Sequence, residues 1–356
     1  QLANALSNAR PGDHIVLANG TYTGNFTLTV PGTAANPIVV RAANKLGAVV
    51  SGGFRIRADH QILWGLVFGN NSGIQTWTGN SCKVLRCKFD GGIQSNDAST
   101  IELRGADCEI ARCEFANHRS RAITVDVNGG ARRALIRYNW FHDVVDNGSN
   151  FNAAIRIGES SLDENTTASC IVEYNLFERY DARYGETVAL KSCDNTVRFN
   201  TLIDCRISAI QSRVGHRNAI NANLVKDQTG AAGGIRVMDR DNVLLGNVLI
   251  GSGMRLEIFA GNRGPDERDN DYSPPAYYPA AWNTILAGNR GNVLVGAYYG
   301  SATPPMTVNA KNTIIEAHSG TITYARHENT TVRPSTNREI PQAVELRPND
   351  VGPNSG

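Results

Sequence analysis

The chain has 356 residues, 35 glycines and a formal net charge of +2. This balance excludes a uniformly basic nucleic-acid binder, and the longest apolar runs fall short of the roughly 18 residues expected of a transmembrane helix. Only six of the 35 basic residues are Lys and 29 are Arg. A biased codon usage would produce this skew, but so would an anionic ligand, because guanidinium groups pair well with carboxylates and sulfates.

The first expected elements are a helix and a strand. Leu2 to Arg10 reads as a short amphipathic helix that ends before Pro11-Gly12, and Asp13 to Ala18 reads as the first strand. We expect residues 1–12 to cap the open end of a β-structure, where an uncovered strand edge would invite aggregation. Because the chain begins inside this element, we expect a leader to have been removed and the protein to be secreted or periplasmic.

A short pattern then recurs through most of the chain: apolar residues, Cys or Asn, any residue, and an aromatic or aliphatic residue. The Cys or Asn positions are 26, 26, 36, 25, 23 and 24 residues apart and comprise Cys87, Cys113, Asn139, Asn175, Asn200, Asn223 and Asn247. A period near 25 with short β segments is the size of one solenoid coil. The chain is therefore predicted to be all-β, a single right-handed parallel β-helix domain over residues 1–356. A helical or leucine-rich solenoid is disfavoured because the segments alternate with a period of two.

The residue types at the repeat fit stacked coils. Equivalent residues of neighbouring coils lie about 4.8 Å apart, so inward residues form stacks and Asn at a bend can bond to its copy on the next coil. Cys87 and Cys113 take this ladder position in early coils, and Cys82 and Cys108 share the same spacing. We expect these Cys to be small buried hydrophobes, with a disulfide between coils as the alternative.

Three segments depart from the repeat. Residues 146–165 hold about ten extra residues between two ladder positions, and residues 253–281 are expected to form one long loop beside a groove. Arg255 and Tyr278 in the second segment would suit sugar rings that carry carboxylates. The tail, residues 334–356, is rich in Pro, Asn and charge, and we expect irregular chain packed along the last coils.

At this point the sequence resembles polysaccharide lyase family 6, the family of alginate lyases and chondroitinase B. The amino-terminal part of the resemblance marks the fold and consists of Arg10-Pro-Gly-Asp13, Gly32-Thr33, Pro37-Ile38 and Gly65-Leu66-x-Phe68. The central part is more specific. It consists of Glu186-Thr-Val-Ala-Leu-Lys191-Ser192, Arg213-Val-Gly-His216, Gly233-Gly-Ile-Arg236 and Ile155-Arg156-Ile-Gly158.

The resemblance implies roles for these residues. Lys191 would be the base that removes the C5 proton of a uronate, and Arg213 would stabilise the leaving glycosidic oxygen. Arg156 and Arg236 would line the substrate groove. Asn152, or alternatively Asn150, would hold a calcium ion together with Glu186. The residue spacing agrees with a shared groove, since Lys191, Arg213 and Arg236 are 22 and 23 residues apart, about one coil each.

Two departures from the family pattern bear on the chemistry. Tyr184 stands where the family carries a second Glu for calcium, and losing a carboxylate puts the ion in doubt. Arg156, Arg183 or Arg236 could then contact the substrate carboxylate. Val214 replaces the family's His, and His216 follows two residues later. Tyr184 and His216 are candidate proton donors, because a guanidinium hardly deprotonates.

Several readings of function remain open at this stage. The resemblance favours an alginate lyase, most compact members being alginate-active, with a dermatan sulfate or chondroitin lyase as the alternative. A hydrolase on the same fold would need converging carboxylates, for which Asp239 and Asp241 are the candidates. A non-catalytic polysaccharide-binding β-helix would keep the Arg groove without needing Lys191. We expect a monomer with an acidic polysaccharide as its partner, and no organic cofactor.

Overall fold

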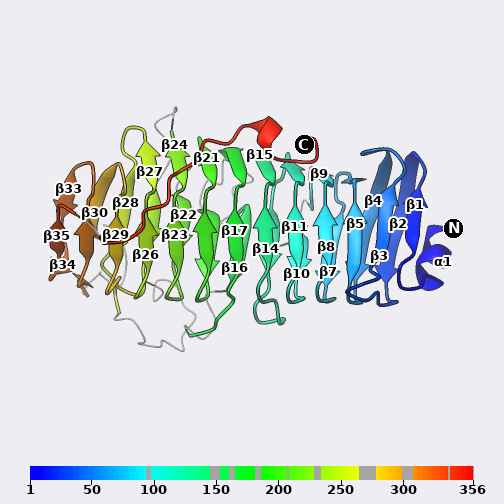
Figure 1. Ribbon diagram of the computed structural model, residues 1–356, viewed down its shortest axis with the longest axis horizontal. Helices are drawn as coiled ribbons and strands as arrows, with labels where there is room; N and C mark the ends of the chain where they lie inside the picture. Colours follow the sequence, from blue (N-terminus) through cyan, green and yellow to red (C-terminus); the bar gives the residue numbers. More distant parts are fainter. Residues whose placement is uncertain are drawn as a thin grey trace.

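The protein is described by a computed structural model that covers residues 1–93, 98–144, 153–159, 165–180, 186–206, 208–227, 234–263, 278–298, 308–335 and 337–355. It is an elongated stack of coils, with both ends of the stack visible in Figure 1. The predicted parallel β-helix with a short N-terminal helix is confirmed. Helix α1 (Leu2–Ser7) buries Leu2 and Leu6 against the first coil and covers its end.

Each coil contributes strands to three parallel faces. The first sheet runs the whole length of the stack and contains β1 (His14–Leu17), β3 (Ile38–Ala42), β5 (Gln61–Trp64), β8 (Lys83–Leu85), β11 (Glu109–Ala111), β14 (Leu135–Arg137), β17 (Ile171–Glu173), β20 (Thr196–Arg198), β23 (Ala219–Asn221), β26 (Val243–Leu245), β29 (Ile285–Ala287), β32 (Ile314–Glu316) and β35 (Thr331–Arg333).

The second and third faces follow in each coil. Two long strands near the N-terminus join them into one 20-stranded sheet of the described residues, and each face is called a sheet below. The second sheet contains β6 (Leu66–Phe68), β9 (Lys88–Asp90), β12 (Glu114–Ala116), β15 (Trp140–Val144), β18 (Leu176–Tyr180), β21 (Thr201–Ile203), β24 (Leu224–Lys226) and β27 (Val248–Ile250). The third sheet contains β7 (Gly73–Trp77), β10 (Ser99–Leu103), β13 (Arg121–Val125), β16 (Ile155–Gly158), β19 (Glu186–Lys191), β22 (Ser208–Ser212), β25 (Ile235–Val237), β28 (Arg255–Phe259), β30 (Asn292–Ala297) and β33 (Ile322–Tyr324).

Near the N-terminus, two long strands, β2 (Gly20–Leu28) and β4 (Ala48–Ile56), span the second and third faces together. β4 pairs with β6 through its first half and with β7 through its second. A short pair, β31 (Ala310–Lys311) and β34 (His327–Glu328), stands apart from the main sheets. A 3₁₀ turn (Pro348–Asp350) lies in the tail.

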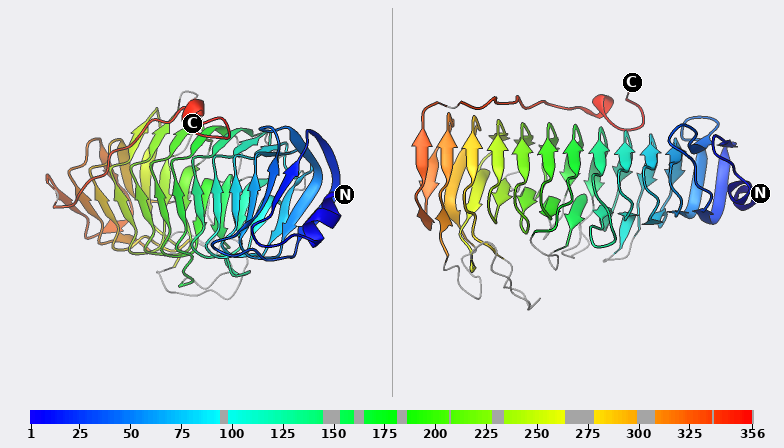
Figure 2. Two further views of the ribbon diagram at one scale, coloured as in Figure 1. Left: turned by 45° about the vertical axis from the view of Figure 1, so that its right-hand side comes forward. Right: turned by 60° about the horizontal axis from the view of Figure 1, so that its bottom comes forward.

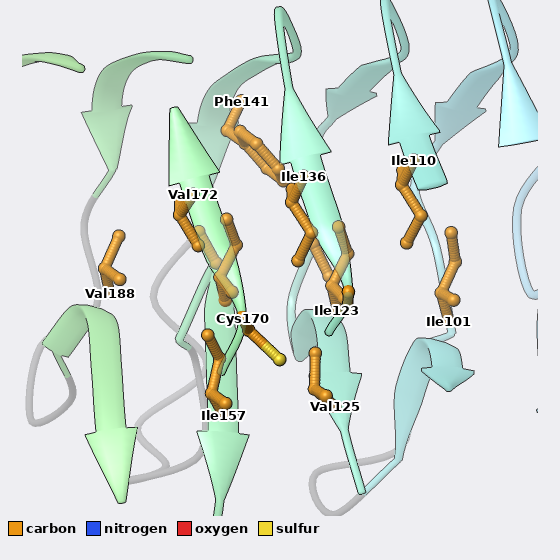
Figure 3. Close-up of a cluster of buried hydrophobic side chains, with 14 of the residues drawn as sticks. Ile101, Ile110, Ile123, Val125, Ile136, Phe141, Ile157, Cys170, Val172 and Val188 are labelled. Carbon is orange, nitrogen blue, oxygen red and sulfur yellow. The ribbon is translucent and has the colours of Figure 1, made fainter. Parts of the chain in front are cut away.

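The interior is built from columns of like side chains. On the third sheet, Ile123, Ile155, Val188 and Ile210 are successive register partners, and all four are fully buried. Figure 3 labels Ile123 and Val188 in this cluster. A column of Phe rings runs beneath the second sheet, with neighbouring centroids 4.6–4.8 Å apart from Phe68 to Phe177. This spacing matches the separation of parallel strands, so each coil repeats the packing of its neighbour.

The predicted Asn ladder is present at the bend between the first and second sheets. Asn200 accepts hydrogen bonds from the backbone N–H and side-chain amide of Asn175, at 2.9 and 3.0 Å, and donates to the oxygen of Asn223 at 3.0 Å. The ladder continues to Asn289, one position beyond the predicted pattern. A second ladder, which the sequence analysis missed, joins Cys170, Asn195, Asn218 and Asn242 through their backbone N–H groups.

The cysteines behave as the repeat indicated. All seven are buried and none forms a disulfide. Cys113 is the N-terminal member of the first Asn ladder, since its N–H donates to Asn139 at 2.9 Å. These thiols are therefore packing groups of the core.

The tail is irregular as expected but extends further than the last coils. It runs back over the stack from β35, as Figure 2 shows, and reaches the coil that contains β8. The Thr201 hydroxyl donates to the carbonyl of Val344, the N–H of Gly352 donates to Tyr138, and Arg112 donates to the Ser355 hydroxyl. The tail thereby ties distant coils together.

Residues 253–281 differ from the expected long loop. Arg255–Phe259 form β28, because Leu256 and Ile258 alternate into the core and pair with β25. Residues 264–277 lie outside the described part of the chain. No helix in the described part is long and apolar enough to cross a membrane.

The Asn ladder generates a stability prediction. Replacing Asn200 with Ala leaves the buried amide of Asn175 and the carbonyl of Val172 without their partner. Each unsatisfied buried group costs about 1–3 kcal/mol, so we expect the free energy of unfolding to fall by at least about 2 kcal/mol. Chemical denaturation followed by circular dichroism measures the change. Asn349→Ala, at an exposed tail position, is the control and should leave the midpoint unchanged. Equal midpoints for both variants would contradict the role of the ladder.

Candidate active site

Most of the predicted site residues lie in two outward-facing columns of the third sheet. The first, here called the arginine column, contains Arg156, Ala189, Gln211, Arg236 and Glu257, which are successive register partners on β16, β19, β22, β25 and β28. The second, the lysine column, contains Gly158, Lys191 and Arg213. Gly158 pairs with Lys191, and the N–H of Arg213 donates to the carbonyl of Leu190 on the preceding coil at 3.0 Å.

Lys191 ends β19 and is partly buried between charged neighbours. The pKa of its amine is lowered to about 8, chiefly by burial and also by the nearby guanidinium groups of Arg213 and Arg156. Glu186 and Glu159 act in the opposite direction, because their carboxylates favour the ammonium form. A substantial share of the amine is therefore neutral at mildly alkaline pH, the form in which a Lys can accept a proton.

Arg213 lies next to Lys191 along the stack and stacks on an aromatic ring. Its guanidinium carbon is 5.1 Å from the centre of the Tyr278 ring. Tyr278 in turn packs against a small buried cluster of Met238, Phe259 and Ala297. This support holds the guanidinium in one place beside Lys191.

Arg156 approaches Lys191 from the preceding coil. It forms an ion pair with Glu159, and only 12% of its side chain is exposed. Gly158 has no side chain and Ala189 has only a methyl group, so the strands place no bulky side chain between Arg156 and Lys191. One amine and two guanidinium groups therefore lie close together on this face of the sheet.

Arg236 is placed differently from Lys191 and Arg213. It lies on the next coil as predicted, but in the arginine column, and its Nε is 2.6 Å from Glu257. Arg255 also pairs with Glu257, at 2.8 Å, and its side chain is about half exposed. Glu257 therefore pairs with two arginines, one on β25 and one on β28, and offsets part of their positive charge.

His216 lies away from the groove. Its side chain has no exposed surface, and its backbone N–H donates to the sulfur of Cys193 on the preceding coil at 3.4 Å. The two acids considered for a hydrolase have structural partners. Asp239 accepts the N–H of Gly215 at 2.9 Å, and Asp241 accepts Arg240 and Asn283 at 2.6 and 3.0 Å.

The described part of the chain includes one of the predicted calcium ligands, Glu186. Of the predicted ligands, Glu186 lies near Lys191, whereas Asn152 and Asn150 fall outside the described residues. Tyr184, the candidate proton donor, lies outside them as well. Arg183 does so too. Glu159, the other carboxylate beside Lys191, is already paired with Arg156. Within the described ranges, no three His, Cys, Asp or Glu side chains gather in a way that could hold a metal. Calcium favours several carboxylate ligands, and the described donors supply one that is not committed elsewhere.

Sequence reasoning missed two acids of the groove, Glu159 and Glu257. Both pair with arginines that it had identified. Residue spacing was the available signal. Glu257 follows Arg236 by 21 residues, close to one coil, and Glu159 follows Arg156 by three. A search for acids at coil spacing from each Arg would have found Glu257.

Comparison with known proteins agrees with this fold. A family model described as chondroitinase B matches residues 1–273. No curated protein matches. Among solved structures, a mannuronic acid-specific family 6 polysaccharide lyase from human gut microbiota has a TM-score of 0.74 at 24% identity, covering 91% of this chain and 80% of the other.

Two further structures have the same fold. The family 6 alginate lyase AlyGC has a TM-score of 0.76 at 21% identity, covering 98% of this chain, which spans only 53% of that longer chain. A family 6 alginate lyase in complex with a trisaccharide has a TM-score of 0.75 at 20% identity, with coverages of 93% and 81%. At these identities the structural matches support the fold, while the family model covers most of the sequence. The chain therefore belongs to the chondroitinase B family, polysaccharide lyase family 6.

Proposed function

We propose that this polysaccharide lyase cleaves alginate by β-elimination, with Lys191 as the base. The observation that supports the proposal is the amine of Lys191, whose pKa is lowered to about 8 by burial and by Arg213 and Arg156. A β-elimination needs a neutral base close to positive charge, and Lys191 fulfils both conditions.

In the proposed reaction, Lys191 takes the C5 proton of the uronate. The electron pair of the C5–H bond forms the C4–C5 double bond, the C4–O glycosidic bond breaks, and the oxygen leaves with the other sugar. The C5 proton is weakly acidic because the adjacent carboxylate is already negative. Removing it demands a cation or strong donors at that carboxylate, and Arg156, next to Lys191, is placed to supply them.

Arg213 is proposed to stabilise the departing oxygen. Its guanidinium lies one coil from Lys191 and is supported by Tyr278. A guanidinium is too weak an acid to give up its proton, so water or Tyr184 would protonate the oxygen. His216 would first have to be uncovered, because its side chain is fully buried. The proton on Lys191 then passes to solvent, which restores the neutral amine.

The substrate is inferred from relatives and from charge. The three solved structures compared above are named as alginate lyases or as specific for mannuronic acid. Arg156, Arg213 and Arg236 lie on separate coils of the third sheet, which suits a polymer with successive carboxylates. The matching family model is described as chondroitinase B, which makes dermatan sulfate the second candidate. We also propose that the protein acts outside the cytoplasm, where such polymers are found, and as a monomer.

The first prediction concerns the base. Wild-type protein should generate ultraviolet-absorbing unsaturated uronates from alginate, and Lys191→Ala should lower kcat by about 10²- to 10⁴-fold, the usual contribution of a general base. Polymannuronate, polyguluronate and dermatan sulfate are compared in the same assay. Lys83→Ala, which removes an exposed Lys of the first sheet, is the control and should retain activity.

Binding separates this proposal from a non-catalytic β-helix. Lys191→Ala should still bind the polymer, because the arginines of the groove remain. Undiminished turnover in Lys191→Ala would exclude Lys191 as the base. Reducing ends without unsaturated products would indicate a hydrolase.

The second prediction concerns pH. Only neutral Lys191 accepts a proton, so kcat/KM should rise about tenfold per pH unit at low pH and level off above a midpoint near 8. Glu186 raises this pKa, so Glu186→Gln should move the midpoint to lower pH. The pH dependence of kcat/KM for both proteins measures the shift. A midpoint near the ordinary Lys value of about 10.4 would contradict the assigned role.

The third prediction concerns metal. If arginines neutralise the substrate carboxylate, dialysis against a chelator should leave kcat/KM within about twofold of its starting value, because no Lewis acid is removed. Arg156→Ala should instead lower it by about tenfold or more, the loss of a charged hydrogen bond. A loss of activity on chelation that added Ca²⁺ restores would show that the ion takes this role.

A further inference from the structure

A second recess lies on the first sheet, at the N-terminal end of the stack and on a different face from the lysine column. The outward side chains of Val39 and Ile62, which are register partners on β3 and β5, form part of its lining. These strands can be followed at the right of Figure 1. The recess has a volume of about 450 Å³, within the range of roughly 300–1,000 Å³ that is usual for ligand pockets.

Trp64 lines this recess and is unusually exposed for its size. Its side chain is 44% exposed, whereas Trp77 on the third sheet is fully buried. Trp64 ends β5, with Arg41 as its register partner on the preceding coil and Leu85 on the following one. A half-exposed indole beside an apolar surface offers a flat face to the C–H side of a sugar ring.

The charge around the recess is positive. Arg41, Lys45 and Arg86 line it, and its lining includes no Asp or Glu. Arg86 donates to the carbonyl oxygens of Pro353 and Ser355 at 3.2 and 2.7 Å, which ties the tail to this edge of the recess. Arg41 on β3 and Lys45 in the turn after it lie beside an apolar surface, which suits a ligand with repeated anionic groups on apolar rings better than a single compact anion.

We propose that this recess is a second carbohydrate site, which binds a uronate-containing segment of the polysaccharide remote from the cleavage groove. The identity of the ligand rests on the proposed function, whereas the site itself rests on Trp64 with Arg41 and Lys45. A polymer held here raises the effective concentration of the same chain at the third sheet. Short oligosaccharides, which cannot span both faces, gain nothing from it.

Binding of long polymannuronate to a cleavage-deficient Lys191→Ala protein tests the site by affinity electrophoresis. Adding Trp64→Ala should weaken binding about five- to tenfold, and Arg41→Gln with Lys45→Gln should weaken it and reduce its dependence on salt. Tyr324→Ala removes an aromatic side chain of similar exposure, 45%, from the third sheet and is the matched control. In the active enzyme, Trp64→Ala should raise KM for the polymer several-fold and leave turnover of short oligosaccharides unchanged.

The outcomes separate the two proposals. Equal polymer affinity with and without Trp64 overturns the second site, even if the enzyme degrades oligosaccharides normally. Equal retardation by an uncharged glucan overturns the assignment of an acidic ligand. Failure of the wild-type enzyme to bind or cleave any polyuronate overturns the proposed function, while Trp64-dependent retardation by dermatan sulfate would keep the site and change its ligand.

Discussion

The structure depends on the register of parallel coils. Hydrogen bonding holds each strand about 4.8 Å from its copy, so a residue type that recurs once per coil becomes a continuous column. The ladder through Asn139, Asn175, Asn200 and Asn223 fixes this register from inside, because each amide bonds both to the backbone and to the next amide. A slip of one residue would exchange the buried Ile and Val columns with the outward Arg and Lys columns.

The same register creates the electrostatics of the groove. Lys191 and Arg213 are brought together because they occupy adjacent coils, and Arg156 lies one coil before. Burial and two nearby guanidinium groups then lower the pKa of the amine. Two acids offset part of this positive charge. Glu159 forms an ion pair with Arg156, and Glu257 forms ion pairs with Arg236 and Arg255. The solenoid thus supplies the conditions for a neutral amine next to retained positive charge.

Much of the fold could be predicted because it repeats. The spacing of Cys113, Asn139 and Asn175 indicated both the coil length and the ladder, which hydrogen bonds confirm. The second ladder was missed although Cys170, Asn195, Asn218 and Asn242 each precede a member of the first ladder by five residues, across one strand of the first sheet. β28 was mistaken for loop because the Arg and Tyr content of residues 253–281 outweighed the alternation of Leu256 and Ile258. The tail's path depends on single contacts such as Arg112 to Ser355, which no repeat reveals. Within the site, the resemblance pointed to Lys191 and Arg213. The column that Arg236 occupies and the burial of His216 depend on the strand register within each coil, which residue spacing alone does not fix.

The central claim is that the amine of Lys191 is neutral at mildly alkaline pH because of where the coils place it. A direct titration of individual Lys amines, by pH-dependent chemical labelling and mass spectrometry, tests this without reference to activity. Lys88 is an internal reference, since burial lowers its pKa but ion pairs with Glu114 and Asp90 outweigh this and raise it. We expect Lys191 to titrate near pH 8, well below Lys88. A Lys191 amine that titrates together with Lys88 would contradict the account.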